Sequence, residues 1–334
     1  MLWLLAACSA ARAYGAPAPT PAESTTVVPA AEYQWLDQVR TLVYDTVWES
    51  AMHVDRWFGS EEPDAAYQQA SGSLVPGVVA DRFHGTQPML RFLGDVPLPQ
   101  LSDSLHAFIG RFNPQEFISE SQPVSGAIPN PYTPFPEDQT MLGLQYYQPV
   151  HPGIQWDSGA GMPLELSRFD PYAKVGYRYQ VGDTSSGVAL WRQDGFYQDS
   201  QGGFGVTSRI DLQRLYSPGL LISWAASTTY AQRSFGWNSY STLEAFYSYA
   251  PNRALVGEAE VDGATRAAVP LQDYGLNLAY RRSILRNWLI LEVRASVDWP
   301  RIFPWQQRVM SPGIGIAFEM VFGSDVFLAR PVTF

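Results

Sequence analysis

The run Leu289-Ile290-Leu291-Glu292-Val293-Arg294-Ala295-Ser296-Val297-Asp298-Trp299 has an apolar residue at every second position and mostly polar residues between. Successive side chains of a strand point to opposite faces, so the run predicts a strand with one apolar and one polar face. Its ten steps cover about 33 Å, and a tilt near 40° reduces that to roughly 25 Å of height. That height matches the apolar band of an outer-membrane barrel and exceeds a typical soluble strand.

The same alternation recurs along the chain, for instance over 173–181, 204–213 and 274–281. A soluble β-sandwich would show it too, so the alternation alone leaves both folds open. Counting such segments predicts an all-β, antiparallel transmembrane β-barrel of fourteen strands, with twelve as the alternative. The expected strand centres lie near residues 77, 91, 107, 145, 158, 175, 190, 209, 224, 244, 257, 278, 293 and 316.

Composition and turn lengths favour the membrane over the sandwich. Aromatic residues make up 14% of the chain and charged residues only 16%, against roughly 25% charged in soluble domains. Tight joins at 217–219, 250–252 and 285–287 alternate with longer, more polar ones near 194–202, 231–238, 262–273 and 300–308. Short periplasmic turns opposite longer outer loops are typical of a bacterial barrel, and they predict both chain ends on the periplasmic side.

The last strand of the barrel is predicted over 313–322. Its alternating apolar residues end on an aromatic one and resemble the C-terminal signal that the barrel-assembly machinery recognises. These residues are Ile314, Ile316, Phe318, Met320 and Phe322. Residues 323–334 are interpreted as a tail, because their pattern is poorer and contains Pro331.

Three segments precede the expected barrel of 73–322. Residues 1–13 indicate a shortened export signal with an Ala11-Arg12-Ala13 cleavage site, whose true start we expect upstream of Met1. An alternative is a lipoprotein signal in which Cys8 is acylated. Residues 14–32 predict a flexible linker, because they hold little apolar surface.

Residues 33–59 change to a spacing of three and four, which predicts an amphipathic helix with one apolar stripe. Two placements remain open. The helix either plugs or lines the lumen, or lies in the periplasm against the barrel mouth or a partner; the second is favoured, because a polar lumen offers little apolar surface.

The segments 274–282 and 287–293, with Trp299-Pro300-Arg301, resemble a family of uncharacterised proteobacterial outer-membrane β-barrel proteins. In that family a helix ending in Trp-Phe-Gly, here Trp57-Phe58-Gly59, precedes the barrel. The resemblance covers about residues 35–322 and implies the fold; it implies no activity.

Residues that carry chemistry are few. No two of His53, His84, His106 and His151 have metal-ligand spacing, so we expect no metal and no other cofactor. Ser104 and His106 share one strand face and are the only hydrolase candidates, but an ordinary polar pair is the favoured interpretation and no enzyme is predicted. A net charge of −10 without a basic stripe argues against nucleic acid.

Six charged residues are expected to face the lumen, where they either set the selectivity of a pore or form ion-pair ladders. They are Arg178, Arg209, Asp211, Arg281, Glu292 and Arg294. Because both signs occur together, the structural role is favoured. The leading hypothesis is a channel or passive transporter of unknown solute in a Gram-negative outer membrane. A non-conducting envelope scaffold is second and a lipid-modifying hydrolase third, with outer-membrane lipid, the assembly machinery and a periplasmic protein on 33–59 as expected partners.

Overall fold

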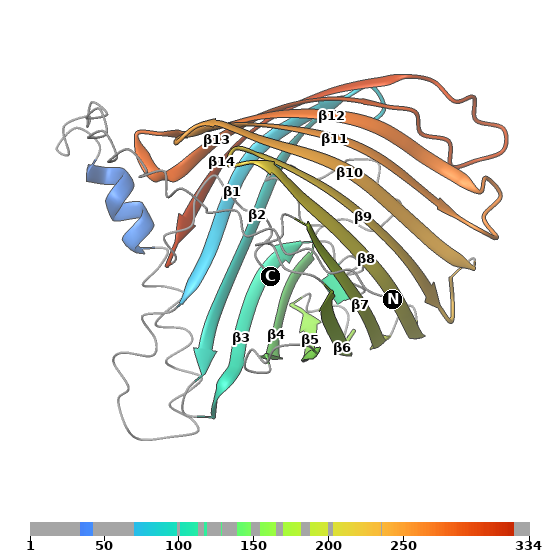
Figure 1. Ribbon diagram of the computed structural model, residues 1–334, viewed down its shortest axis with the longest axis horizontal. Helices are drawn as coiled ribbons and strands as arrows, with labels where there is room; N and C mark the ends of the chain where they lie inside the picture. The colour runs from blue at the N-terminus through green and yellow to red at the C-terminus, as the bar shows by residue number, and fades with distance from the viewer. Residues whose placement is uncertain are drawn as a thin grey trace, which may run out of the picture.

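A closed barrel of fourteen antiparallel strands forms most of the described chain (Figure 1). The computed structural model describes residues 34–42, 70–98, 101–112, 117–118, 128, 139–147, 154–164, 170–181, 188–199, 203–234 and 236–323. The strands are β1 (Ser71–Asp81), β2 (Gly85–Leu98), β3 (Ser102–Phe112), β4 (Gln139–Tyr147), β5 (Ile154–Pro163), β6 (Tyr172–Val181), β7 (Val188–Asp199), β8 (Gly203–Ser217), β9 (Leu220–Ala231), β10 (Trp237–Ala250), β11 (Arg253–Ala264), β12 (Leu271–Ile284), β13 (Arg286–Asp298) and β14 (Ser311–Phe322). Every expected strand centre falls inside one of these strands, so the prediction of fourteen is confirmed.

The ring closes where the first strand pairs with the last. Val78 lies opposite Ile316, and Gly72 lies opposite Phe322. The ring of Phe322 covers Gly72 so closely that a Cβ there would lie 2.3 Å from its Cζ. A glycine is therefore required at this position, as in other sheets where an aromatic ring packs over an edge glycine.

The exposed face of the wall is apolar and the buried face is polar, which is the reverse of a soluble protein. On β12, Leu276 and Leu278 are more than half exposed, whereas Asn277 between them is buried. On β13, Glu292 and Arg294 are buried and face inward. Because a closed sheet has only an inner and an outer side, the exposed apolar residues form the outer face and the buried charges form the inner one.

Connections differ in length between the two ends of the barrel. At the end where β1 begins and β14 ends, β8 and β9 are joined by residues 218–219, β10 and β11 by 251–252, and β12 and β13 by Leu285 alone. Leu285 adopts a φ of 56°, a conformation that closes so tight a turn. At the opposite end, 265–270 and 299–310 are longer. The predicted alternation is confirmed for these joins.

One predicted loop is largely strand. The stretch 194–202 was expected as a connection, yet β7 continues to Asp199 and β8 begins at Gly203. Phe196 and Tyr197 follow each other there on opposite faces and have polar residues on both sides, so the alternation of apolar and polar residues stops while the backbone ladder continues. The alternation alone therefore underestimates the length of this strand.

A helix over residues 34–42 packs against the outer side of the barrel (Figure 1). Leu36 is buried among Leu74 of β1, Leu289 of β13 and Met320 of β14, all of which belong to the outward row. The helix covers the closing seam at the end where β1 begins and β14 ends. Of the two placements left open, the lumen is wrong for this part of the predicted 33–59 helix.

Several predictions fall outside the described residues. These are the export signal of 1–13, the linker of 14–32, the helix beyond residue 42 with Trp57-Phe58-Gly59, and the tail beyond Gly323. Among the described residues, no helix has the length and apolar character needed to cross a bilayer.

Candidate functional site

The inner wall of the barrel carries the six charged residues singled out from the sequence. Each lies on the inward row of its strand: Arg178 on β6, Arg209 and Asp211 on β8, Arg281 on β12, and Glu292 and Arg294 on β13. They do not form one site. The structure divides them between the β6–β8 wall and the β12–β13 wall.

On the β6–β8 wall, Arg209 and Asp211 form an ion pair within one strand. Nη2 of Arg209 lies 2.5 Å from Oδ1 of Asp211, and Nε of Arg209 lies 2.8 Å from Oδ2. Residues two apart on a strand share a face, which allows this two-point contact. Arg178 donates instead to the side-chain oxygen of Gln193 at 2.8 Å.

The β11–β14 wall holds a larger network of charges. Arg281 lies 3.3 Å from Glu292 and also pairs with Glu319 of β14. Arg294 lies 3.7 Å from Glu258 of β11 and donates to Asn277 at 3.3 Å. Side chains of opposite charge are in direct contact on these four strands, as the interpretation as an ion-pair ladder requires.

Sequence analysis missed an acidic cluster on the same wall. Asp262 of β11 lies directly opposite Asp273 of β12. A Cβ on Gly275 would lie 2.2 Å from Oδ1 of Asp298 and 3.4 Å from Oε1 of Glu260, so these two carboxylates converge over the glycine. The signal was visible as Glu258, Glu260 and Asp262 at every second position.

Two carboxylates of this cluster are buried without hydrogen bonds. The oxygens of Asp273 and Asp298 have no partner among the described residues, and the two side chains are 3% and 0% exposed. Buried polar groups are normally paired, so this wall of the lumen has an excess of acceptors that favours cationic groups. No group of three or more potential metal ligands is arranged around one point in the described chain.

The connection from β3 to β4 folds into the barrel. Phe117 and Ile118 pack against the inward side chains Phe108, Met141 and Tyr172. Lys174 of β6 lies 4.4 Å from the centre of the Phe117 ring and donates to the Phe117 carbonyl. Phe117 and Ile118 of this connection therefore lie on the inner side of the barrel wall.

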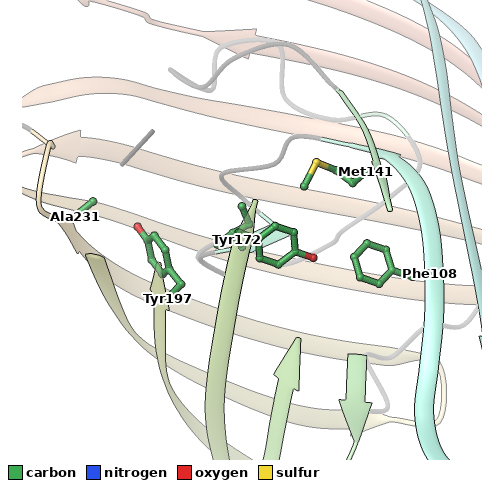
Figure 2. Packing of buried hydrophobic residues seen from close by; sticks show 6 residues of the cluster. Phe108, Met141, Tyr172, Tyr197 and Ala231 are labelled. Atoms are coloured by element: carbon green, nitrogen blue, oxygen red, sulfur yellow. The ribbon is translucent and has the colours of Figure 1, made fainter. Parts of the chain in front are cut away.

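Aromatic rings line the wall where Phe117 and Ile118 pack. Figure 2 shows Phe108, Tyr172 and Tyr197 on the inner side of neighbouring strands, with Met141 among them. Glycines opposite the rings leave room for them: a Cβ on Gly143 would lie 2.7 Å from the Phe108 ring, and one on Gly205 would lie 2.1 Å from that of Tyr197.

A second point of the same connection contacts the opposite wall. Ile128 is 2% exposed and packs against Val75 of β1 and Ala317 of β14. Its backbone amide donates to Glu292 at 3.2 Å, and its carbonyl accepts a bond from Arg294. The three described residues of this connection, Phe117, Ile118 and Ile128, thus contact two different parts of the inner wall.

The hydrolase candidates are not brought together as a catalytic pair. Nδ1 of His106 lies 2.6 Å from Oδ1 of Asp95, and the His106 ring meets Tyr147 edge-on at 5.1 Å. The amide of Ser104 donates to the hydroxyl of Ser102. Of the other histidines, His84 pairs with Asp81 in the β1–β2 turn, while His53 and His151 lie outside the described residues.

Comparisons with known proteins find similarity of overall shape only. No family model matches the sequence, and no curated protein matches it. Among solved structures, OprB of Pseudomonas putida is 11% identical at a TM-score of 0.48, covering 76% of this chain and 94% of its own. The outer membrane channel DcaP of Acinetobacter baumannii is 9% identical at 0.45, covering 76% and 96%. An anion-selective porin from Comamonas acidovorans is 11% identical at 0.44, covering 76% and 98%. What this barrel does is therefore inferred from its own residues.

Proposed function

We propose that this chain is a channel of a Gram-negative outer membrane that admits small water-soluble molecules passively. The observation that carries the proposal is the reversed polarity of the wall. Leu276, Leu278 and Ile314 expose more than half of their surface on the outer face, while charged residues are buried inside. An apolar belt around a closed sheet is stable in hydrocarbon and would aggregate in water.

The two ends of the barrel support an orientation in that membrane. The end with the tight turns, where β1 begins and β14 ends, belongs in the periplasm, and the end with the 299–310 connection belongs outside the cell. The helix of 34–42 then lies at the periplasmic rim. Trp35 and Leu42 are largely exposed there, and they remain candidates for contact with a periplasmic partner or with lipid.

The interior supports a channel with a narrow middle. A ring of fourteen strands is wider than the eight-stranded barrels that side chains fill completely. The connection between β3 and β4 reduces that space through the contacts of Phe117, Ile118 and Ile128. The charges of the β11–β14 wall lie beside this narrowing, because Glu292 and Arg294 bind Ile128 directly.

A non-conducting scaffold is the second candidate. The observation that favours it is the near-complete burial of Glu292, Arg294, Arg209 and Asp211. Side chains that line an open aqueous pore would be more exposed to solvent. The hydrolase stays the least supported hypothesis, because His106 binds Asp95 and the hydrogen bonds described for Ser104 do not involve it.

Single-channel recording in planar bilayers tests the proposal. We expect discrete conductance steps from the purified chain, unchanged when residues 33–59 are deleted, because the described part of that helix lies outside the lumen. If neither protein conducts, and heat-modifiable migration verifies that both are folded, the scaffold is the hypothesis that remains. A Ser104→Ala variant should leave the lipid composition of the envelope unchanged.

The finer assignments stay predictions. Membership in the uncharacterised proteobacterial family rests on 274–282 and 287–293. Recognition of Ile314 to Phe322 by the assembly machinery rests on the sequence pattern and on the place of β14 as the closing strand.

A further inference from the structure

A group of polar side chains lies on the outer face of β6, β7 and β8. Asp194 of β7 accepts hydrogen bonds from the hydroxyl of Tyr177 at 2.6 Å, the hydroxyl of Ser208 at 2.5 Å and Nε of Arg192 at 3.1 Å. We call these four residues the outer polar patch. Tyr177 and Ser208 are the ladder neighbours of Asp194 on either side, so the patch is one row of the wall with Arg192 beside it.

The patch faces outward. On β7 the inward row contains Gln193 and Tyr197, and Tyr197 belongs to the aromatic cluster of the interior. Asp194 belongs to the other row, together with Phe196, which is 42% exposed. The Arg192 side chain is 47% exposed, whereas that of Asp194 is 10% exposed. The carboxylate is thus enclosed by its donors, and the guanidinium presents its remaining surface to whatever surrounds the barrel.

The patch lies at mid-height of the wall. Asp194 is five residues from the extracellular end of β7 at Asp199 and six from its periplasmic end at Val188. Five steps along a tilted strand correspond to about 13 Å of height, which is half of a band roughly 25 Å tall. Apolar side chains lie above and below it in the outward rows, including Val175, Phe196, Val206, Leu190 and Ile210. The patch is therefore enclosed by the apolar band.

Hydrocarbon is a poor environment for this group. An arginine at the midplane of a barrel's lipid face is destabilising, and ionisable groups at that depth normally face protein or water. The opposite sector shows what a lipid contact looks like in this chain. Outward residues of β12 and β14 there include Leu276, Leu278, Ile314 and Ile316.

The polar character continues along the same row. Ser208 lies opposite Thr228 of β9, which lies opposite Ser239 of β10, and the Thr228 and Ser239 hydroxyls are 3.3 Å apart. Beside them, Nε1 of Trp224 donates to Ser241 at 3.0 Å. Small side chains form a flat strip from β8 to β10, which permits another wall to approach closely.

We propose that the outer polar patch, with the flat strip beside it, is the contact between two copies of this chain in the membrane. The patch contains an exposed cation and an anion side by side. Two such patches are complementary to each other, because the exposed guanidinium of one copy can donate to the half-buried hydroxyl oxygens of Tyr177 and Ser208 in the next. The proposal rests on the outer-membrane placement proposed above.

A lipid phosphate is the competing occupant, since arginine also binds phosphate well. Depth argues against it. A headgroup would have to descend about 13 Å from the outer rim to reach Arg192. Lipopolysaccharide therefore enters as an outcome of the test.

Site-directed cross-linking in intact outer membranes tests the contact. In a Cys8→Ser background, Ser208→Cys and Ala295→Cys each place one thiol on the outer face, the first in the patch and the second on β13 in the apolar sector. Mild oxidation should convert most of the Ser208→Cys protein to a band of twice the monomer mass and leave Ala295→Cys monomeric. Equal cross-linking of both variants would indicate random collision and would overturn the proposal.

A second variant separates the contact from folding. Arg192→Leu with Asp194→Leu makes the patch apolar, so a lipid-embedded monomer should fold and show heat-modifiable migration. In mild detergent, native mass measurement should give an oligomer for the wild type and a monomer for the double variant, with conductance per barrel unchanged. If the wild type and the double variant are both conducting monomers, the proposed contact between copies is wrong and the proposed channel function stands. Wild-type monomers that retain lipopolysaccharide, lost in the double variant, would assign the patch to lipid.

Discussion

The carboxylate of Glu292 accepts a hydrogen bond from the backbone amide of Ile128 at 3.2 Å, although 164 residues separate them in sequence. The contact joins the connection between β3 and β4 to the far wall of the barrel. Arg294 binds the carbonyl of the same residue, so one peptide is held from both sides. These two bonds fix the position of Ile128 against the inner wall.

Replacing Glu292 with Ala should enlarge the conducting path. The Ile128 amide would lose its acceptor and Arg281 one of its two carboxylates, at a cost of about 3 kcal/mol for a buried charged group left without its partner. We expect a higher single-channel conductance and a lower unfolding midpoint in urea. Glu292→Gln keeps an oxygen for the amide and should stay near the wild-type conductance.

The matched control is Glu319→Ala, which also removes a carboxylate from Arg281 but has no described hydrogen bond to Ile128. It should lower stability and leave conductance unchanged. Equal conductance changes in both variants would show that Ile128 does not limit the path.

Neutralising the acidic cluster should reduce preference for cations. Glu260→Gln with Asp298→Asn removes two carboxylates that converge over Gly275. The potassium-to-chloride permeability ratio should fall roughly twofold, because the charge of a pore lining sets which ions it favours. Zero-current potentials in a salt gradient measure it. Thr207→Ala, on the inner face of β8 and away from the cluster, should not move them; a shift as large as that of the double variant would argue against the assignment.

Docking of the helix over 34–42 should weaken in acid. Nη2 of Arg286 donates to Oδ2 of Asp37 at 2.8 Å, and this bond holds the pKa of Asp37 below its usual value of 3.8, with Arg40 adding a smaller effect. A lowered pKa contributes stability above pH 3.8 that is lost as the pH falls through the folded value. Because the Asp37 side chain is 46% exposed, the contribution is at most about 1 kcal/mol.

A fluorophore on Thr41→Cys in the Cys8→Ser background reports the docking, since Trp288 of the same contact quenches when the helix is bound. Quenching should decrease on acidification from pH 6 to pH 3. With Asp37→Asn added, quenching should be weaker at pH 6 and insensitive to the same change. An unchanged pH profile in that variant would mean that another group titrates.

A charge on the outer face of β12 should impair the folded barrel. Leu278→Arg puts a guanidinium in the apolar band and should cost about 2–4 kcal/mol near the bilayer midplane. Urea titration of the refolded protein in lipid vesicles measures the loss. Leu278→Met is the neutral control. If the arginine variant were as stable as the methionine one, the outer face would not contact hydrocarbon.

Phe322→Ala should remove the ring that covers Gly72 and cost about 3 kcal/mol, as for other buried phenylalanines. Refolding from urea reports that loss without the assembly machinery. Expression in cells adds recognition of the last strand, so Phe318→Ala, whose side chain is 42% exposed, should refold normally and accumulate poorly in the outer membrane. Normal accumulation of Phe318→Ala would contradict the assembly-signal prediction.

The sequence predicted the bounds of a strand most accurately where its outward residues form the apolar band. There the period of two is forced by lipid on one side and polar groups on the other, so the predicted bounds of β13 and β14 lie within three residues of the observed ones. In β7 polar residues such as Asp194 occupy the outward row, so the period is lost and the strand was predicted too short. The inward position of Arg209 and Glu292 followed from parity, but their partners did not, because pairing between strands depends on register that no single strand contains.

The contacts of Ile128 and of residues 34–42 could not have been predicted from local pattern. Both join segments far apart in sequence; the spacing of 33–59 predicts a helix with an apolar stripe but not the strands against which that stripe packs. The outer polar patch was overlooked for a different reason. Asp194 was placed in a loop, where a carboxylate needs no explanation; only its position in the middle of β7 makes it unusual.

Leu36 binds a surface that does not exist until synthesis and folding are complete. Leu74 comes from the first strand, whereas Leu289 and Met320 come from the last two, so their side chains meet only after β14 has joined β1. A partly folded intermediate, open at the seam, has nowhere to dock the helix. The N-terminal segment thereby distinguishes a finished ring from an unfinished one, and a bound helix reports that the last step of assembly has taken place.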